Sequence, residues 1–229
     1  MKPKFLYFFF FIISINCTKP TNSDAFIENV TGRYLYDSDQ VIEVYFKDKV
    51  LLLTWKGIKD IKPMKFDDDI FFVKEMNEKI TFKTNPQDQK EYLVLLPKEE
   101  GAEITFNFKK LEKNELTPSE YLANDNFEEA LAGYIAIQQK DSLNIAVNEN
   151  EMNAIGYYHL GRNEIPKAIN VLKINAVLHP KSDNVFDSLG EAYLKSGDTL
   201  QAIVNYKKAL AIDSGNRRAK NVVEKFDKK

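Results

Sequence analysis

Between residues 28 and 112, short apolar segments alternate with polar breaks, a pattern that predicts consecutive antiparallel strands. Seven such segments, from GRYLY to EITFNF, are rich in β-branched and aromatic residues. Within the second segment, Glu43 separates Ile42 from Val44, as a strand with one buried face requires. We therefore expect an antiparallel β-domain here, closed as a barrel or folded as a two-layer sandwich so that few strand edges are exposed.

Beyond the β-domain the apolar positions take helical spacing, which predicts an all-α array over residues 118–229. Two units of equal length, 149–182 and 183–216, should each form a pair of antiparallel helices. A shorter, degenerate unit at 118–145 precedes them, and residues 217–227 predict an amphipathic helix that caps the last unit. The expected fold class is α+β, with a β barrel or sandwich followed by about 2.5 helical repeats.

Small residues recur at matching places in the two complete units. Gly190 and Ala202 of the last unit align with Gly156 and Ala168 of the one before it. Two antiparallel helices can cross closely only where one side chain is small. A larger residue at Gly190 or Ala202 should therefore clash with the other helix of the pair.

The last unit resembles a tetratricopeptide repeat (TPR), and the resemblance extends over roughly residues 118–227. It rests on the family's packing positions, here Phe186, Leu189, Gly190, Tyr193, Gly197, Ala202, Tyr206 and Ala209. This resemblance implies an array that binds another protein. The β-domain is similar in pattern to the small β-domain that follows the catalytic domain of many bacterial serine hydrolases of the β-lactamase and penicillin-binding type, at Gly32-Arg33-Tyr34, Val50-Leu51-Leu52-Leu53, Phe71-Phe72 and Ile80-Thr81-Phe82.

Residues 1–16 have the composition of a secretory signal peptide, with two lysines ahead of an apolar run. That run is much shorter than the roughly 20 residues that span a bilayer as a helix. Ser14-Ile15-Asn16-Cys17 resembles a bacterial lipobox, which implies that Cys17 becomes lipidated and that residues 17–27 form a tether. Because Cys17 is the only cysteine, the exported chain would have no thiol for a disulfide or a metal. The lipobox implies anchoring to the cell envelope, and Thr18 in place of aspartate favours the outer membrane.

Charge excludes one class of partner. Without Lys2 and Lys4 of the signal, the chain carries 30 basic against 34 acidic side chains and has no basic block. Binding to a phosphate backbone needs such a block, so we expect no nucleic-acid partner.

Motifs for catalysis are missing from the sequence. A serine hydrolase would need Ser-x-x-Lys or Gly-x-Ser-x-Gly, and neither occurs. His159 and His179 are too far apart for a zincin pair, and Asp67-Asp68-Asp69 lacks the glycine and alternating ligands of a calcium loop. Trp55 could line a ligand pocket in the β-domain, although packing in the core is the simpler interpretation. We expect no enzyme activity, no cofactor and no metal.

The first helices of the two complete units should line the inner face of the array. Polar side chains expected there, and predicted to meet a partner, are Asn150, Asn153, Tyr157, Asn184, Asp187, Glu191 and Lys195. The alternative interpretation is an ordinary solvated face. The set lacks the cluster of basic residues and asparagines with which some TPR domains clamp a C-terminal carboxylate.

These observations lead to one main hypothesis and two alternatives. The main hypothesis is a non-enzymatic envelope lipoprotein whose array binds an unidentified envelope protein or peptide. The alternatives are a carrier that holds a small apolar ligand in the β-domain, and an accessory subunit of a separately encoded serine hydrolase.

Overall fold

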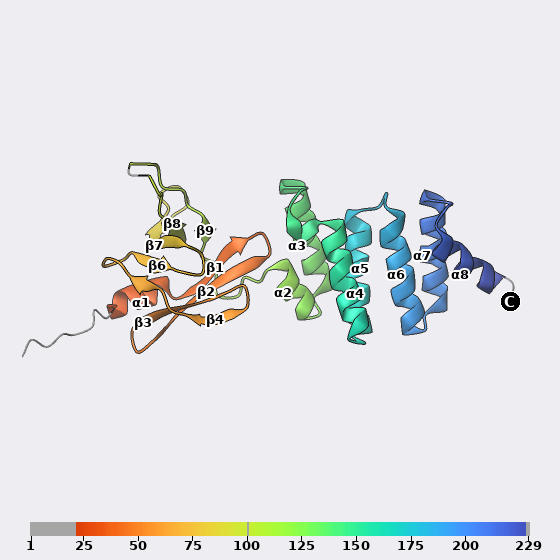
Figure 1. Cartoon of the computed structure of the whole chain (residues 1–229), viewed down its shortest axis with the longest axis horizontal. Coiled ribbons are helices and arrows are strands. Elements are labelled where there is room, and N and C mark those ends of the chain that lie inside the picture. Colours follow the sequence, from red (N-terminus) through yellow and green to blue (C-terminus); the bar gives the residue numbers. More distant parts are fainter. Residues whose placement is uncertain (1–21, 100, 228–229) are drawn as a thin grey trace, which may run out of the picture.

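The computed structural model describes residues 22–99 and 101–227. The chain forms a β-domain and a helical array that follow one another along the longest axis of the molecule (Figure 1). The expected fold class is confirmed, because antiparallel sheets precede an all-α array of helix pairs. The predicted signal peptide and Cys17 lie outside the described residues. Within those residues, no helix has the length and apolar character needed to cross a membrane.

The β-domain consists of two antiparallel sheets with strands in sequence order. The first contains β1 (Gly32–Asp37), β2 (Gln40–Lys47), β3 (Val50–Trp55) and β4 (Ile58–Ile61). The second contains β5 (Met64–Lys65), β6 (Phe71–Val73), β7 (Glu78–Thr84), β8 (Glu91–Leu95) and β9 (Phe108–Lys109). β1 meets the end of β9 through a single bridge between Tyr34 and Lys110, so the domain is an open, sandwich-like pair of sheets and not a closed barrel.

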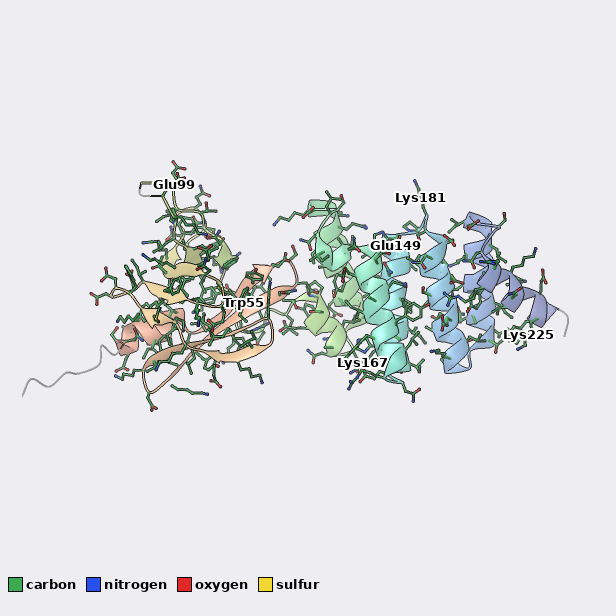
Figure 2. The ribbon with its side chains drawn as sticks, viewed as in Figure 1. Trp55, Glu99, Glu149, Lys167, Lys181 and Lys225 are labelled. Carbon is green, nitrogen blue, oxygen red and sulfur yellow. The ribbon has the colours of Figure 1, made fainter. Side chains whose placement is uncertain are left out.

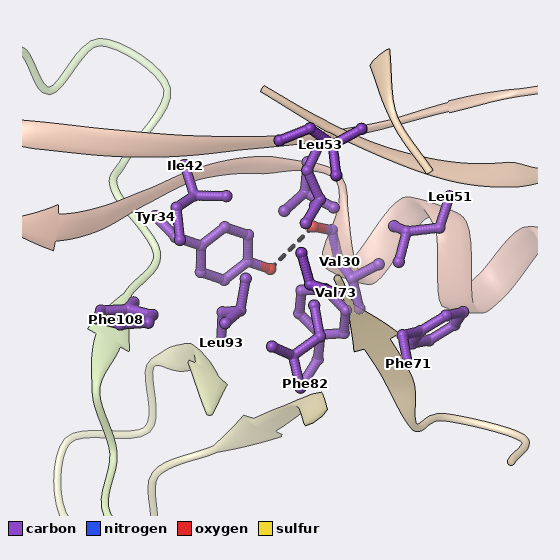
Figure 3. Close-up of a cluster of buried hydrophobic side chains, with 13 residues drawn as sticks. Val30, Tyr34, Ile42, Leu51, Leu53, Phe71, Val73, Phe82, Leu93 and Phe108 are labelled. Carbon is purple, nitrogen blue, oxygen red and sulfur yellow. Dashed lines mark hydrogen bonds between the residues drawn. The ribbon is translucent and has the colours of Figure 1, made fainter. Parts of the chain in front are cut away.

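Alternation along the strands builds the core between the sheets. In β2, Ile42 and Val44 are buried while Glu43 is exposed, as predicted. Tyr34 lies wholly inside, where its hydroxyl donates a hydrogen bond of 2.8 Å to the carbonyl oxygen of Val30 (Figure 3). A buried hydroxyl without such a partner would destabilise the fold, so this bond allows a tyrosine to fill the centre of the core.

A short helix, α1 (Asp24–Val30), occupies the end of the segment predicted as a tether. Ser23 caps it by accepting a hydrogen bond from the backbone N–H of Phe26. The ring of Phe26 packs against Phe71 and Phe82, so the apolar side chain of this segment belongs to the core. The prediction of a tether was therefore wrong for residues 24–27, because one buried aromatic side chain does not produce a hydrophobic period in the sequence.

Strand prediction failed at two further places. Residues 103–108 were expected to form a strand, but only Phe108 belongs to one, and Ile104 is 41% exposed. β4 and β5 were missed because they are short and mostly exposed, so no alternation marks them.

The helical array consists of three antiparallel helix pairs and a last helix (Figure 1). The pairs are α2 (Pro118–Ala123) with α3 (Phe127–Lys140), α4 (Glu149–Gly161) with α5 (Ile165–Leu178), and α6 (Asp183–Ser196) with α7 (Thr199–Ile212). A 3-10 turn, η1 (Ile145–Val147), precedes α4, and α8 (Arg217–Asp227) follows α7.

Close crossings hold each complete pair together. A Cβ atom added at Gly190 would lie 3.1 Å from the ring of Tyr206, and one at Gly156 would lie 2.6 Å from Leu172. Both partners belong to the second helix of the same pair. The glycines are therefore small for the reason that the sequence suggested.

Candidate interaction surface

The predicted inner face brings side chains of α4 and α6 together. The Tyr157 hydroxyl donates a hydrogen bond of 2.9 Å to Glu191, which stands 34 residues later at the matching position of the next unit. The two helices thus present matching faces side by side, as an array with a regular repeat requires.

An arginine from the last helix occupies this face. Nε of Arg218 donates to Asp187 at 2.7 Å, Nη2 donates to the Tyr157 hydroxyl at 3.1 Å, and Nη1 pairs with Glu191. We call Tyr157, Asp187, Glu191 and Arg218 the Arg218 cluster. The hydrogen bond to Asp187 raises the pKa of Arg218 further above its ordinary value, so the guanidinium stays charged.

The Arg218 cluster corrects part of the sequence interpretation. Asp187 is only 5% exposed, and Tyr157 and Glu191 are bound to Arg218, so these three side chains are engaged within the array. They were expected to point toward a partner without packing. Their internal partner, Arg218, comes from the capping helix α8, where it stands at the next position of the 34-residue register.

The other residues predicted to meet a partner differ in how exposed they are and in whether they are already hydrogen-bonded. Asn184 donates a hydrogen bond of 3.2 Å to Glu149, and Asn153 is half-buried, with an Oδ1 that accepts no hydrogen bond from the described residues. Asn150 and Lys195 are exposed, and Lys195 lies 3.9 Å from Glu191. Of the predicted set, Asn150 and Lys195 are therefore the best placed to meet another molecule.

Arg218 was missed although the sequence contained a signal for it. It stands 34 residues after Asn184, which stands 34 residues after Asn150. Extending the repeat register into the capping helix would have placed all three on one face.

A second candidate site lies between the β-domain and the array. A pocket of about 340 Å³ opens between the β1–β2 turn, the first helix pair, η1, α4 and α5, and we call it the junction pocket. Its apolar lining includes Leu122, Ile145, Ala146, Met152, Ile155 and Val171. The sequence interpretation did not find it, because its walls come from segments more than a hundred residues apart.

Hydrogen bonds hold the β1–β2 turn against the first helix pair. The carboxylate of Asp39 accepts from the backbone N–H of Ser119 at 2.8 Å and from the Tyr134 hydroxyl at 2.9 Å. Burial raises the pKa of Asp39, although these hydrogen bonds act against the shift. Arg33 adds an ion pair to Glu120, whose carboxylate also closes the capping box of α2 with Thr117.

The remaining chemical candidates have structural roles. Nδ1 of His159 lies 2.7 Å from Glu164, and Nε2 of His179 lies 2.9 Å from the carbonyl oxygen of Val147. Trp55 packs edge-on against Tyr36, on the side of the β-domain toward the array (Figure 2). Residues 22–99 and 101–227 contain no group of three or more His, Cys, Asp or Glu side chains placed to hold a metal ion.

Comparison with known proteins detects similarity only to solved structures. No protein-family model matches the chain, and no curated protein matches it. The second TPR domain of human RPAP3 in complex with an HSP70 peptide is 18% identical, covering 49% of this chain and 90% of that domain, with a TM-score of 0.35. The Sgt2 TPR domain from Aspergillus fumigatus is 16% identical, covering 48% and 72%, with a TM-score of 0.35. The Yersinia enterocolitica type III secretion translocator chaperone SycD is 16% identical, covering 49% and 89%, with a TM-score of 0.34.

The geometry of the array itself agrees with a repeat of 34 residues. The two complete helix pairs and the glycine contacts at Gly156 and Gly190 repeat with a spacing of 34 residues, and Tyr157 contacts Glu191 across the same spacing.

Proposed function

We propose that this chain is a non-enzymatic lipoprotein of the bacterial cell envelope, anchored through Cys17, whose helical array binds another envelope protein. The observation that carries the proposal is the repeated face of α4 and α6, where Asn150 and Lys195 remain exposed beside the ordered Arg218 cluster. A surface already ordered in the unbound state loses little side-chain freedom on binding. The lipobox supports the anchor, and the absence of catalytic motifs in the sequence supports a binding role.

The surface is built from rigid elements. The Arg218 cluster joins three helices, α4, α6 and α8, and these contacts restrain their spacing. In a TPR array, the first helices line the face that receives an extended or helical segment of another protein. We assign this role to the face that bears Asn150, Asn153, Asn184 and Lys195.

The test is chemical crosslinking in intact cells, with the wild-type protein beside an Asn150→Ala/Lys195→Ala double variant. These positions are chosen because Tyr157 and Glu191 also hold α8, so their loss would disturb the fold. The matched control is Lys181→Ala, an exposed lysine in the α5–α6 connection. Circular dichroism of the purified proteins checks that the helices are intact.

We expect a protein captured by the wild type and by the control, and lost from the double variant. Equal capture by all three would overturn the assignment of this face. If the wild type captured nothing beyond the background of cells that lack it, the proposal of a protein-binding role would itself fail.

The two alternative functions gain no support from the geometry. Phe71 and Phe82 of the β-domain fill the space between the sheets together with Tyr34 and Leu93, which leaves the core occupied by side chains. The accessory-subunit hypothesis depends on the resemblance of both halves of the chain to modules attached to serine hydrolases, and it stays a prediction.

A further inference from the structure

The junction pocket exists because the first helix pair is incomplete. α2 runs for 6 residues, whereas α4 and α6 run for 13 and 14. Residues 141–148 separate α3 from α4, while only residues 179–182 separate α5 from α6. The first helix pair therefore covers α4 less completely than the α4–α5 pair covers α6.

Equivalent positions in α4 and α6 show what this missing cover changes. Ile155 of α4 is 47% exposed, whereas Leu189, at the same position of α6, is 5% exposed. Glu151 of α4 stands where α6 has Val185, which is fully buried. The pocket is thus a place that a complete array would fill with its own side chains, and it combines uncovered apolar surface with a carboxylate.

Acidic groups collect at one end of the pocket. Asp37 ends β1, Asp39 lies in the β1–β2 turn, and Glu151 lies in the first turn of α4. Asn144, just before η1, contacts Asp37 and Ser38, which brings the turn to this end of α4. Among the described residues, no lysine or arginine lies within ion-pair distance of these three carboxylates.

The basic groups of the pocket lie elsewhere. Lys167 lies in the first turn of α5, which runs antiparallel to α4, so it stands at the opposite end of the pair from Glu149 and Lys181 (Figure 2). His159 is one helical turn or more beyond Ile155 and is bound to Glu164. The carboxylates of the acidic end therefore have no cation paired with them among the described residues, and this end of the pocket favours a cation.

We propose that the junction pocket binds a segment of a partner protein in which a bulky aliphatic residue is next to a lysine or arginine. The aliphatic side chain packs on Met152 and Ile155, and the cation lies beside Glu151 and Asp37. A volume of about 340 Å³ is near the lower limit for ligand pockets and suits one or two side chains of a peptide. The proposal rests on the protein-binding function above, but it concerns a different surface from the face of Asn150 and Lys195.

The test begins with short random peptides displayed on phage and selected against the full chain. Enriched peptides are then measured by fluorescence anisotropy against Ile155→Asp and Glu151→Lys. The matched controls are Val204→Asp, which is 47% exposed like Ile155 but lies on α7, and Glu129→Lys, an exposed glutamate in the first turn of α3. Neither control residue lines the pocket.

We expect peptides with an aliphatic residue next to a basic one, and a loss of affinity of about tenfold or more in each pocket variant. The controls should bind as the wild type does, and binding should weaken as salt rises. Enrichment of acidic peptides, equal binding to pocket and control variants, or no enrichment would each overturn the proposal. Peptides that lose affinity only in Asn150→Ala/Lys195→Ala would overturn it while leaving the protein-binding function intact.

Discussion

At the scale of single residues, surroundings decide what a side chain can do at a given position. Gly156 and Gly161 belong to the same helix, α4, yet a Cβ added at Gly156 would meet Leu172 at 2.6 Å, whereas one at Gly161 would have no neighbour within 4 Å. Alanine favours a helix over glycine by about 1 kcal/mol. Overpacking a closely fitted contact costs about 1–3 kcal/mol.

Gly156→Ala should therefore lower the free energy of unfolding by up to about 2 kcal/mol, once the gain in helix propensity is subtracted from the overpacking cost. Gly161→Ala, the matched control, should leave it unchanged or raise it slightly, because it gains propensity without a clash. Urea unfolding followed by circular dichroism measures both. If Gly156→Ala proved as stable as Gly161→Ala, the close crossing of α4 and α5 would be contradicted.

The sequence predicted which residues pack inside the array more reliably than which residues face a partner. The two glycines were placed correctly because a small residue in a repeat has one main physical reason to be there. Asp187 was placed on a partner-facing surface because a carboxylate is usually exposed, and its burial depends on Arg218, 31 residues away. Whether a polar side chain faces solvent is decided by its partners, and the local sequence does not contain them.

At the scale of elements, α8 completes the array by covering the apolar side of α7. Ala219 and Val223 are buried against Ala202, Tyr206 and Ala209. Arg218 extends from the same helix to the inner face and neutralises a nearly buried carboxylate at Asp187. The capping helix thus stabilises the array through an apolar contact and an ionic one.

Arg218→Met should destabilise the protein by about 1–3 kcal/mol, because it leaves the Asp187 carboxylate without its cation. The lower part of this range is expected, since the Arg218 side chain is 43% exposed and solvent screens the pair. Faster hydrogen exchange at the backbone amides of α8 would identify the region that loosens.

Arg217→Met is the control, since it removes an exposed arginine from the same turn of α8 and should change stability by less than about 0.5 kcal/mol. Arg218→Met/Asp187→Asn should recover part of the loss because it also removes the buried charge. Equal stabilities of Arg218→Met and Arg217→Met would show that the Arg218 cluster does not stabilise the capping helix.

Elements with a long repeated period could be predicted, and short ones could not. The helix pairs were found because a 34-residue spacing repeats several independent packing positions. The turn at Lys56-Gly57 was recognised, but β4 after it was not, because only Ile61 of that strand is buried. Residues 103–108 alternate like a strand, yet most of them find no neighbouring strand to pair with.

At the scale of the whole molecule, a small set of polar contacts fixes the β-domain on the array. Arg33 of β1 pairs with Glu120 of α2 and donates a hydrogen bond of 2.8 Å to the carbonyl oxygen of Glu115. Asp39 of the neighbouring turn contacts both helices of the first pair. Because α2 is too short to be stable alone, the β-domain should supply part of its stability.

Arg33→Ala should uncouple the two domains. Trp55, the only tryptophan, reports by fluorescence on unfolding of the β-domain, while far-ultraviolet circular dichroism reports mainly on the array. Loss of the half-buried Arg33 contacts should cost about 1 kcal/mol and move the helical transition to lower urea. The fluorescence transition should move less, so the difference between the two midpoints changes from its wild-type value.

Lys47→Ala is the control for this experiment, because the ion pair of Lys47 with Asp60 lies wholly within the β-domain. It should leave the separation of the two midpoints unchanged. Arg33→Ala/Glu120→Ala should be no less stable than the sum of the single variants predicts, as expected when both act through one contact. If Arg33→Ala moved both transitions equally, Arg33 would stabilise the β-domain itself, and the walls of the junction pocket would be held by the contacts of Asp39 and Asn144.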